Sequence, residues 1–280
     1  MGAGLVGPRH HATEPFSRRW LGQAPGHAAV LGWSTLAVLP LLLLALWQDG
    51  AEAVLRLVLA TAVALAWQAG FARLRGRALQ LDGWLTAGGL LILLGPDLPL
   101  AQLLITTSFA IVFGEQLFGG RGRYLVNPVV LGLAFQAYAF GPQAATPIAG
   151  LGLVAAFGAL LLVLQGLISW RVLLAAALGV GLVFLYQGDW RWPALHDPIW
   201  FALLFLLTDP VAAAVTPLGR WWYGALAGVL LAWHLPPTGE PSSLPAVAFA
   251  LLLASLFAPL IDRVVMVVLV FRRRRRTAHV

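Results

Sequence analysis

Long apolar runs alternate along this chain with short clusters of glycine, proline and charged residues. Several runs approach the roughly 20 residues that an α-helix needs to cross a bilayer. Helices also satisfy their own backbone hydrogen bonds, as the bilayer interior demands. The pattern therefore predicts an all-α polytopic membrane protein with about ten transmembrane segments. The expected segments are residues 28–47, 53–72, 83–95, 99–114, 125–140, 150–168, 171–187, 197–208, 221–235 and 245–270.

Two of these segments, 83–95 and 197–208, are too short to cross the bilayer as straight helices. The first ends at Gly95-Pro96, and the second ends at Thr208-Asp209-Pro210. Proline breaks a helix, and broken backbone at membrane depth is tolerated only inside protein or beside a cavity. The sequence therefore predicts a buried site or a cavity at these breaks.

The two short segments hold the same ordinal place in two sets of five, which indicates an internal duplication. An odd number of helices in each repeat would place the second copy upside down, as in many membrane proteins whose sites lie at the repeat interface. We therefore expect two inverted five-helix repeats with broken short helices, at approximately residues 27–141 and 150–270. Both belong to a single membrane domain over residues 27–271.

Composition agrees with a membrane location. The 280-residue chain is 60% hydrophobic and 10% charged, whereas soluble domains are about 25% charged. Many of the 12 tryptophans lie at the ends of apolar runs, where an amphipathic ring suits the headgroup region. There are no cysteines, which excludes disulfides and iron–sulfur clusters ligated by this chain alone.

The arginines fix the expected orientation. If the N-terminal tail, residues 1–26, is cytoplasmic, all of the 18 arginines except Arg56 and Arg191 lie inside, as the positive-inside rule requires. Both termini are then cytoplasmic, and the basic tail at 272–280 anchors the last helix at the lipid surface. This topology accounts for the net charge of +7, so we expect the lipid bilayer and no nucleic acid as a partner.

Two polar connections are candidates for ligand binding. The turn containing Gly119, Gly120 and Arg121 is glycine-rich and basic, so it could hold a phosphate or be a plain inside loop. Asn127 and Pro128 begin an apolar segment, where asparagine is a good helix cap and proline is ordinary. The exposed helix start could equally point at a ligand.

Acidic residues at or near membrane depth are stronger candidates for function, because charge in the bilayer is costly. Asp209 lies at a helix break, where its carboxylate could coordinate a cation, cap a helix or hold a ligand. Glu115 and Asp82 lie near the inside boundary, and Asp262 adjoins Arg263, with which it could form an ion pair. Asp209, Glu115 and Asp262 are the candidates for ion coupling.

Three blocks of this sequence resemble the RnfD/NqrB family. They are FGEQLFGGRGRYLVNPVVLG at 113–132, LLTDPVAAAVTPLGRWWYGALAG at 206–228 and LFAPLIDRVV at 256–265. The resemblance spans most of the chain and keeps the blocks in the family's order. It implies a membrane subunit of an Rnf or sodium-pumping NADH:quinone oxidoreductase complex, which carries flavin between partner subunits. It also implies a fold of inverted five-helix repeats like that of urea transporters.

The resemblance further implies a flavin attachment site. Family members usually bear FMN, joined by a phosphoester to a threonine in an outward loop, and the matching residue is Thr146. The expected topology places this loop outside. However, Phe140, Gln143 and Ala144 stand where the attachment motif has Asp, Ser or Thr, and Gly. Non-covalent flavin in the same pocket, riboflavin included, is therefore the alternative to covalent FMN.

Ten further positions match the family blocks, and we expect them to line the flavin pocket. They are Gly119, Gly120, Asn127, Pro128, Thr208, Asp209, Pro210, Thr216, Gly219 and Arg220. Glu115 departs from the family, in which a basic residue is common just before the QLFGG sequence. This departure bears on phosphate contacts or on ion selectivity.

The interpretation that follows is a flavin-carrying electron-transfer subunit of an ion-translocating oxidoreductase in the bacterial inner membrane, and not an enzyme by itself. Its expected partners are other membrane subunits of the redox complex and an extracytosolic FMN-binding flavoprotein. Two alternatives remain open. One is a small-solute transporter or channel with the same inverted-repeat fold. The other is a redox conduit that pumps no ion and serves an extracytosolic flavoprotein.

Overall fold

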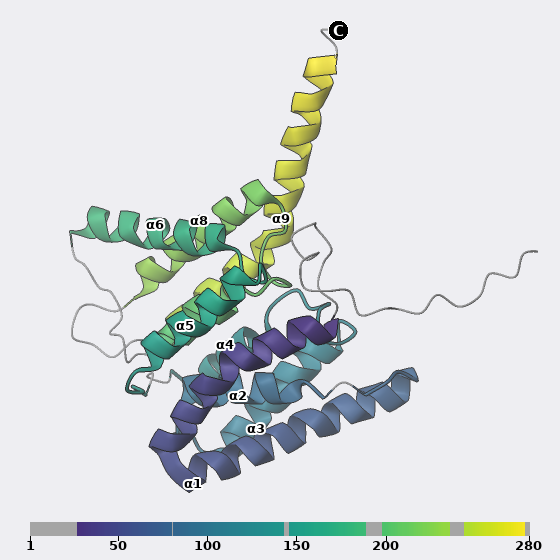
Figure 1. Ribbon diagram of the computed structural model, residues 1–280, viewed down its shortest axis with the longest axis vertical. Coiled ribbons are helices and arrows are strands. Elements are labelled where there is room, and N and C mark those ends of the chain that lie inside the picture. The colour runs from purple at the N-terminus through teal and green to yellow at the C-terminus, as the bar shows by residue number, and fades with distance from the viewer. Residues whose placement is uncertain (1–26, 80, 143–145, 189–197, 236–243, 278–280) are drawn as a thin grey trace, which may run out of the picture.

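Helices form all the regular secondary structure in the part of the chain that the computed structural model describes, which comprises residues 27–79, 81–142, 146–188, 198–235 and 244–277. The elements, in which η marks a π-helical segment, are α1 (His27–Arg75), α2 (Gly83–Leu94), α3 (Leu100–Phe109), η2 (Ala110–Gln116), α4 (Pro128–Phe140), α5 (Leu151–Leu164), α6 (Trp170–Gln187), α7 (Ile199–Phe201), η3 (Ala202–Leu206), α8 (Pro217–His234) and α9 (Leu244–Thr277). The expected all-α fold is thus confirmed for these residues. Figure 1 shows α6 and α8 side by side and the end of α9 projecting from the body.

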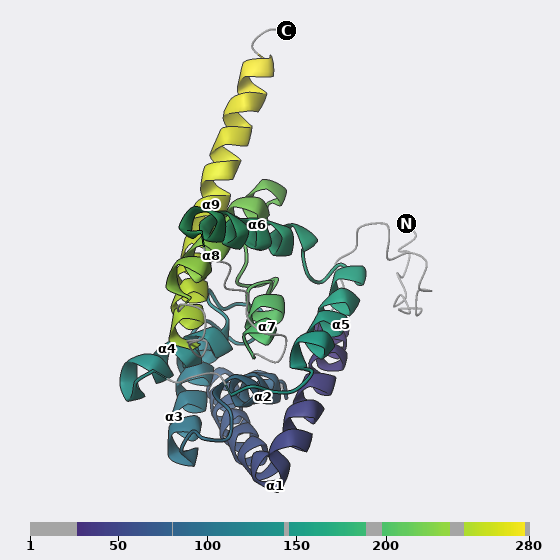
Figure 2. The ribbon, with the colours of Figure 1, turned by 90° about the vertical axis from the view of Figure 1, so that its left-hand side faces the viewer.

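A kink at Gly50 divides α1 into two arms, which Figure 2 shows as a V. Gly50 has φ of 70°, a left-handed conformation that glycine adopts readily. The expected segments 28–47 and 53–72 are therefore joined by a bend and not by a loop. The first arm packs on α5 near Ala37, and the second packs on the start of α2 at Ala64.

Among the described residues, three helices are long and apolar enough to cross a membrane, namely Ala29–Arg75, Trp170–Gln187 and Leu244–Phe271. Several other apolar helices are shorter, as expected for a chain with interrupted membrane segments. The chain is a helical membrane protein on this evidence, whereas ten crossings and inverted repeats stay predictions. The helix α9 continues to Thr277, so the arginines of the expected basic tail extend the helix. The expected N-terminal tail lies outside the described residues.

A similar local design occurs once in each half of the chain. In the first half, η2 leads into a glycine-rich turn, and α4 then begins with Asn127 as its cap and Pro128 as its first residue. In the second half, η3 leads into a proline-containing turn, and α8 begins with Thr216 and Pro217 in the same roles. π-Helical segments frequently mark functional sites. The two stretches precede the fifth and the ninth expected segments, which do not hold the same place in two sets of five. The likeness is therefore local and does not follow from the expected duplication.

The capping residues also explain where the sequence pattern misplaces two helix boundaries. The apolar pattern predicts starts at 125 and 221, but α4 begins at Pro128 and α8 begins at Pro217. A cap side chain accepts a hydrogen bond from a free N–H of the first turn, and proline fixes the backbone angle there. These two effects, and not the edge of the apolar run, set the first helical residue.

Hydrogen bonds join connections that the expected topology places on the same side of the membrane. The side chains of Arg75 and Arg77 donate to the carbonyl oxygens of Gln116 and Gly119, respectively. At the opposite end of α2, Gln48 Nε2 donates to the carbonyl oxygen of Pro147 at 3.0 Å, and Gln48 Oε1 accepts from the Ala149 backbone N–H. Arg56 donates to the carbonyl oxygen of Leu98 at that end. Each end of the molecule therefore has its own set of hydrogen bonds between connections.

Glycines let α6 and α8 approach each other closely. A Cβ atom on Gly179 would lie 2.7 Å from the carbonyl oxygen of Ala225, and one on Gly228 would overlap the carbonyl oxygen of Ala176. Small residues at helix contacts allow the tight van der Waals packing on which membrane helices depend. The position of α8 therefore follows from these glycines.

Candidate functional site

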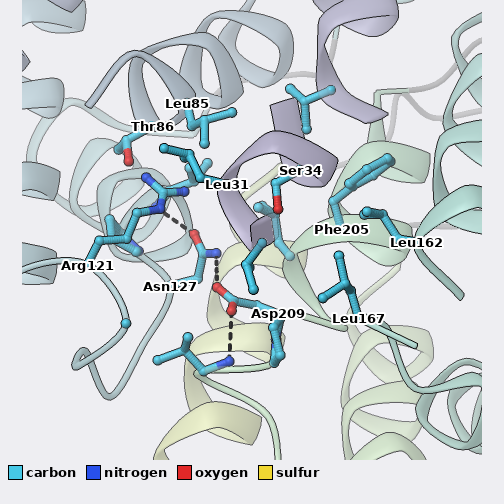
Figure 3. A pocket seen from close by; sticks show the side chains of 18 of the residues that line it. Leu31, Ser34, Leu85, Thr86, Arg121, Asn127, Leu162, Leu167, Phe205 and Asp209 are labelled. Atoms are coloured by element: carbon cyan, nitrogen blue, oxygen red, sulfur yellow. Dashed lines mark hydrogen bonds between the residues drawn. The ribbon is translucent and has the colours of Figure 1, made fainter. Parts of the chain in front are cut away.

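Asp209 is the centre of a buried hydrogen-bonded group that connects the two halves of the chain. The hydroxyl of Tyr124 donates to Asp209 Oδ2 at 2.8 Å, and Asn127 Nδ2 donates to the same oxygen. The other oxygen, Oδ1, accepts from the Val211 backbone N–H at 2.9 Å. Three donors stabilise the ionised carboxylate, which removes much of the cost of its burial. Figure 3 shows Asn127 and Asp209 pointing toward one another.

Asn127 has the capping role that the sequence allowed, and it makes a second contact, to Asp209, that the sequence did not indicate. Its Oδ1 accepts from the Val129 N–H at 2.9 Å, so it caps α4, while its Nδ2 bonds to Asp209. Pro128 is the first residue of the helix behind it. The side chain is therefore held at both ends, and it has one position beside the cavity described next.

A cavity of about 150 Å³ adjoins this group. Its polar side is formed by Asn127, Asp209, Thr86 and Arg121. Its apolar walls come from both halves of the chain and comprise Leu31, Val38, Leu85, Leu162, Leu167, Phe201, Phe205 and Leu206. An apolar cavity with a few convergent polar groups is the usual form of a ligand site. Figure 3 shows Phe205 and Leu162 across Ser34 from the polar side.

Burial raises the pKa of the Tyr124 phenol well above its usual range, and the nearby Asp209 carboxylate raises it further. Both causes act in the same direction, because each disfavours a second negative charge at this position. Tyr124 therefore stays protonated through the physiological range, where it donates to Asp209. Tyr124 thus adds no negative charge to the polar side of the cavity around neutral pH.

Residues Thr208 and Pro210 complete the helix break on either side of Asp209. The hydroxyl of Thr208 donates to the carbonyl oxygen of Leu204 at 2.5 Å, so it is used within the preceding π-helical turn. Pro210 lines the cavity. Of the three residues of the TDP sequence, Asp209 and Pro210 thus reach the cavity, and Thr208 supports the break.

Three other predicted residues form a second cluster at the start of α8. Thr216 caps the helix by accepting from the Gly219 N–H at 3.0 Å. Asp262 of α9 accepts from the Thr216 hydroxyl at 2.5 Å and from the Thr216 and Val215 backbone N–H groups. A Cβ on Gly219 would overlap both the Thr216 and the Asp262 oxygens. Asp262 therefore holds the helix start, which differs from the expected ion pair with Arg263.

Arg220 donates to the carbonyl oxygen of Ala214 at 3.3 Å, and it is not among the residues that line the cavity beside Asp209. Gly119 and Gly120 also lie apart from that cavity. They have φ of 106° and 101°, which favour glycine, and they line a second, polar cavity near Arg75 and Arg77. These predicted residues thus shape backbone turns around the site.

Thr146 lies at the other end of α2, next to the point where that helix stops. Gly95 caps α2 with φ of 66°, and a Cβ atom there would overlap the Thr146 hydroxyl. The Thr146 side chain is half-buried. Its loop contains Gln143 and Ala144, which lie outside the described residues. The cavity touches α2 at Thr86, and Thr146 lies at Gly95. Since an α-helix rises about 1.5 Å per residue, roughly 14 Å of helix separate Thr146 from the cavity beside Asp209.

The predicted residues therefore occupy four places, whereas the sequence analysis expected one pocket. Asn127, Pro128, Asp209 and Pro210 meet at the cavity, and Thr208 supports the helix break beside them. The others lie at the start of α8, in the glycine-rich turn and at the end of α2. Sequence reasoning missed Tyr124, which lies inside the first of the three blocks, and Thr86, which lies in the short segment 83–95. A tyrosine between a glycine-rich turn and a helix cap gives no periodic signal, so its contact with Asp209 appears only in three dimensions.

Comparisons with known proteins identify relatives over most of the chain. The model of the NQR2, RnfD, RnfE family matches residues 23–150 and 149–269. A subunit of the Na(+)-translocating NADH-quinone reductase of Ectopseudomonas mendocina is 27% identical over 267 residues, which cover 75% of this chain and 66% of the relative. The corresponding subunits from Pseudomonas aeruginosa and Yersinia pestis are 28% and 27% identical. This chain thus spans slightly less than two thirds of the length of these relatives.

Proposed function

Because this chain belongs to the NQR2, RnfD, RnfE family, we propose that it is a flavin-carrying membrane subunit of an ion-translocating NADH:quinone oxidoreductase in the bacterial inner membrane. The identity of its relatives supports this proposal, since they are subunits of a sodium-translocating reductase. The family match covers both halves of the membrane domain. The partners in this proposal are other membrane subunits of the complex and an extracytosolic FMN-binding flavoprotein.

The observation that carries the proposal is the contact of Asn127 with Asp209 at the wall of a cavity. These residues belong to the two sequence blocks that resemble the RnfD/NqrB family most specifically. They are 82 positions apart, yet they form one polar wall. A contact of this kind fits a ligand that touches both halves of the domain.

The residues around the cavity fit a flavin ring system. A flavin presents a flat apolar ring with a polar edge, and this cavity has aromatic walls at Phe201 and Phe205 and hydrogen-bonding groups at Asn127, Thr86 and Arg121. An engineered apolar cavity of about 150 Å³ holds a benzene ring. The cavity is therefore large enough to hold part of a fused-ring system. When bound, the flavin would supply the electron-transfer chemistry.

Each residue has a definite role in this proposal. Phe201 and Phe205 pack on the ring and exclude water, and their own rings stack at 5.3 Å between centroids. Asn127 orients the polar edge, because its amide is fixed by the cap of α4 and by Asp209. Asp209 holds Asn127 and Tyr124 in place, so it acts as a positioning residue. Preorganised groups of this kind tune a cofactor without moving when its charge changes.

Thr146 is the proposed attachment point for a second flavin, FMN, at the opposite end of α2. Its hydroxyl lies against Gly95, where the missing Cβ leaves room for the side chain. Covalent attachment and non-covalent binding both remain compatible with this position. Two flavins placed at the two ends of one short helix would form a path for electrons through the domain.

The first experiment is in-gel flavin fluorescence of the denatured chain, co-expressed with a flavin transferase and the partner subunits. We expect a fluorescent band in the wild type that disappears in Thr146→Ala and persists in Thr146→Ser, because serine keeps an acceptor hydroxyl. A band of equal intensity in Thr146→Ala would place the attachment elsewhere. No band in the wild type would rule out covalent attachment under these conditions.

A second experiment tests the cavity through the flavin that acid precipitation releases from the native protein. We expect Asp209→Asn to lower the released flavin at least tenfold, because a carboxamide offers one acceptor oxygen to three donors. Asp97→Asn, at an exposed position in a connecting loop, is the matched control and should keep the wild-type content. Wild-type protein that contains no flavin, and that takes up a small solute into liposomes without redox partners, would contradict the proposal and favour a transporter.

A further inference from the structure

Two completely buried carboxyl groups lie near the glycine-rich turn, outside the contacts described so far. Asp82, which precedes α2, is 1% exposed, and Glu115 of η2 is 0% exposed. One side-chain amide bridges them, because Gln68 Nε2 donates to Asp82 Oδ1 at 2.8 Å and to Glu115 Oε1 at 2.8 Å. Gln116 Nε2 adds a second donor to Glu115 Oε1 at 3.0 Å. The two carboxyl groups are therefore close neighbours in one buried cluster.

One cation faces this pair within ion-pair distance in the described part of the chain. Arg121 Nε lies 3.8 Å from Asp82 Oδ2, and Arg121 Nη1 lies 4.0 Å from Glu115 Oε2. If both carboxyl groups were ionised, the cluster would carry one uncompensated negative charge. Buried groups in this situation neutralise by taking up a proton, since an unpaired buried charge is very costly.

The cluster also has two defects in its hydrogen bonding. Asp82 Oδ2 and Glu115 Oε2 are buried, and neither has a hydrogen-bond partner among the described residues. Such groups in a native protein need an explanation, because a buried polar atom without a partner is destabilising. A proton on one carboxyl group turns an acceptor into a donor and makes the net charge of the cluster zero. A single proton thus remedies both the charge and part of the hydrogen-bond deficit.

A bound metal cation explains the cluster less well. Arg121 lies about equally far from both of the free oxygens, and its positive charge would repel a second cation between them. The described residues also contain no group of three or more histidine, cysteine or acidic side chains that could hold a metal ion. Tyr124, on the same turn as Arg121, remains neutral because burial raises its pKa.

A route to solvent adjoins the cluster. A polar cavity of about 520 Å³ is lined by Gln68, Gln116 and Arg121, which are the side chains that contact the two carboxyl groups. The other basic residues of its wall are Arg75, Arg77 and Arg123, and no acidic residue lines it among those described. Asp82 and Glu115 do not themselves line this cavity, so a proton exchanges with its water when one of the intervening side chains, Gln68, Gln116 or Arg121, moves aside.

We propose that Asp82 and Glu115 form a proton-binding site that holds one proton at neutral pH and exchanges it with water through the cavity lined by Gln68, Gln116 and Arg121. The proton joins a carboxylate oxygen of the pair and leaves to water, so no other reactant is needed. Arg121 also lines the cavity beside Asp209. The proton-binding site therefore lies next to the proposed flavin. The evidence for the proton-binding site is the contacts of Asp82 and Glu115 alone, so it does not depend on the flavin.

Infrared spectroscopy of the full-length chain in lipid nanodiscs tests this site without any flavin or partner. We expect the wild type at neutral pH to show the C=O stretch of a protonated carboxyl group, which shifts in D₂O. Both Glu115→Gln and Asp82→Asn should lose this band, because Arg121 balances the one carboxylate that remains. Asp262→Asn is the control, and it should keep the band, since Asp262 already accepts three hydrogen bonds.

Several results would overturn the proposal. The band could be absent from the wild type, or it could survive in either of the two single variants, which would mean that the carboxyl groups do not act as a pair. A band that appears only after sodium is replaced by choline would show that a cation occupies the site. Size-exclusion chromatography establishes that each variant is folded, and Gln and Asn preserve the side-chain volume.

The exchange route has its own test. Ala72 lines the polar cavity, and Ala72→Phe should slow the hydrogen–deuterium shift of the band several-fold by filling it. Ala66 is exposed on the same helix and lies outside the cavity wall, so Ala66→Phe should leave the exchange rate unchanged. An unchanged rate in Ala72→Phe would show that the proton takes another path.

Discussion

At the scale of single residues, the site depends on how a buried carboxylate is satisfied. Asp209 is 7% exposed, and it accepts three hydrogen bonds from Tyr124, Asn127 and Val211. Asn127 is itself fixed as the cap of α4, while Tyr124 and Val211 donate from the turns on either side of the two helix breaks. A hydrogen bond to a charged group contributes about 1.5–3 kcal/mol, more than a neutral pair.

We predict that Tyr124→Phe lowers the free energy of unfolding by about 1.5–3 kcal/mol, because it leaves Asp209 Oδ2 with one donor fewer. Thermal unfolding in nanodiscs measures the effect. Tyr138→Phe is the matched control, since Tyr138 is 88% exposed, and it should have no effect. Equal stability of the two variants would contradict the role given to Tyr124.

The effect of Tyr124→Phe should not change between about pH 6 and pH 9. The pKa of Tyr124 is raised in the folded protein, so the contribution of its protonated form is fully present below the ordinary pKa of tyrosine, about 10. That contribution is lost only as the pH rises through the raised folded-state pKa. Unfolding curves of the wild type and Tyr124→Phe across this pH range measure the difference in stability. A difference that begins to shrink near pH 7 would contradict the prediction.

At the scale of elements, the helix contacts depend on residues that lack side chains. The helices α6 and α8 meet through Gly179, Gly224 and Gly228, and a Cβ atom at each would lie within 2.7 Å of a backbone carbonyl oxygen of the other helix. Backbone cannot move aside as a flexible side chain can. The position of α8 in turn sets the cap at Thr216 and the contact with Asp262.

We predict that Gly228→Ala destabilises the protein by about 1–3 kcal/mol, the usual cost of overpacking a tight contact. Gly181→Ala is the matched control, because Gly181 lies on α6 with nothing within 4 Å of the added Cβ. It should leave stability unchanged or raise it slightly, since alanine favours helix over glycine. Similar unfolding temperatures for both variants would show that α6 and α8 can separate without cost.

At the scale of the whole molecule, the two ends of α2 carry different groups. One end has Asp82, Arg121 and the arginine-lined cavity, and the other has Gly95 and Thr146. The expected topology places the first end in the cytoplasm and the second outside. In the two proposals, the flavin at Thr146 and the proton site at Asp82 and Glu115 would then lie toward opposite sides of the membrane.

Single cysteines test this arrangement, because the chain has no cysteine of its own. Ala149→Cys and Ala78→Cys both lie at exposed positions, at opposite ends of the molecule. We expect a membrane-impermeant maleimide to label Ala149→Cys in intact cells and Ala78→Cys only after permeabilisation. The cysteine-free wild type gives the background. Labelling of both variants from the same side would overturn the predicted topology.

The sequence by itself determined the class of the protein and the identity of its main blocks. Apolar runs of bilayer length predict helices because the lipid interior offers no other partner for backbone groups, and helices form all the regular structure in the described residues. The breaks at Gly95 and Asp209 were also predictable, because glycine and proline act on the backbone locally. The resemblance to the family was visible in the residues of three blocks, and the family model matches both halves of the chain.

Only the tertiary structure decided which of these residues meet. Asn127 touches Asp209 across 82 positions of sequence, while Thr146 lies at the far end of α2 beside Gly95. Asp82 and Glu115 share one amide of Gln68. Hydrophobic periodicity records which face of a helix is buried, but it does not record the partner on that face. Contacts between distant segments depend on helix directions and on glycines that permit close approach, and these are fixed only when the whole chain packs.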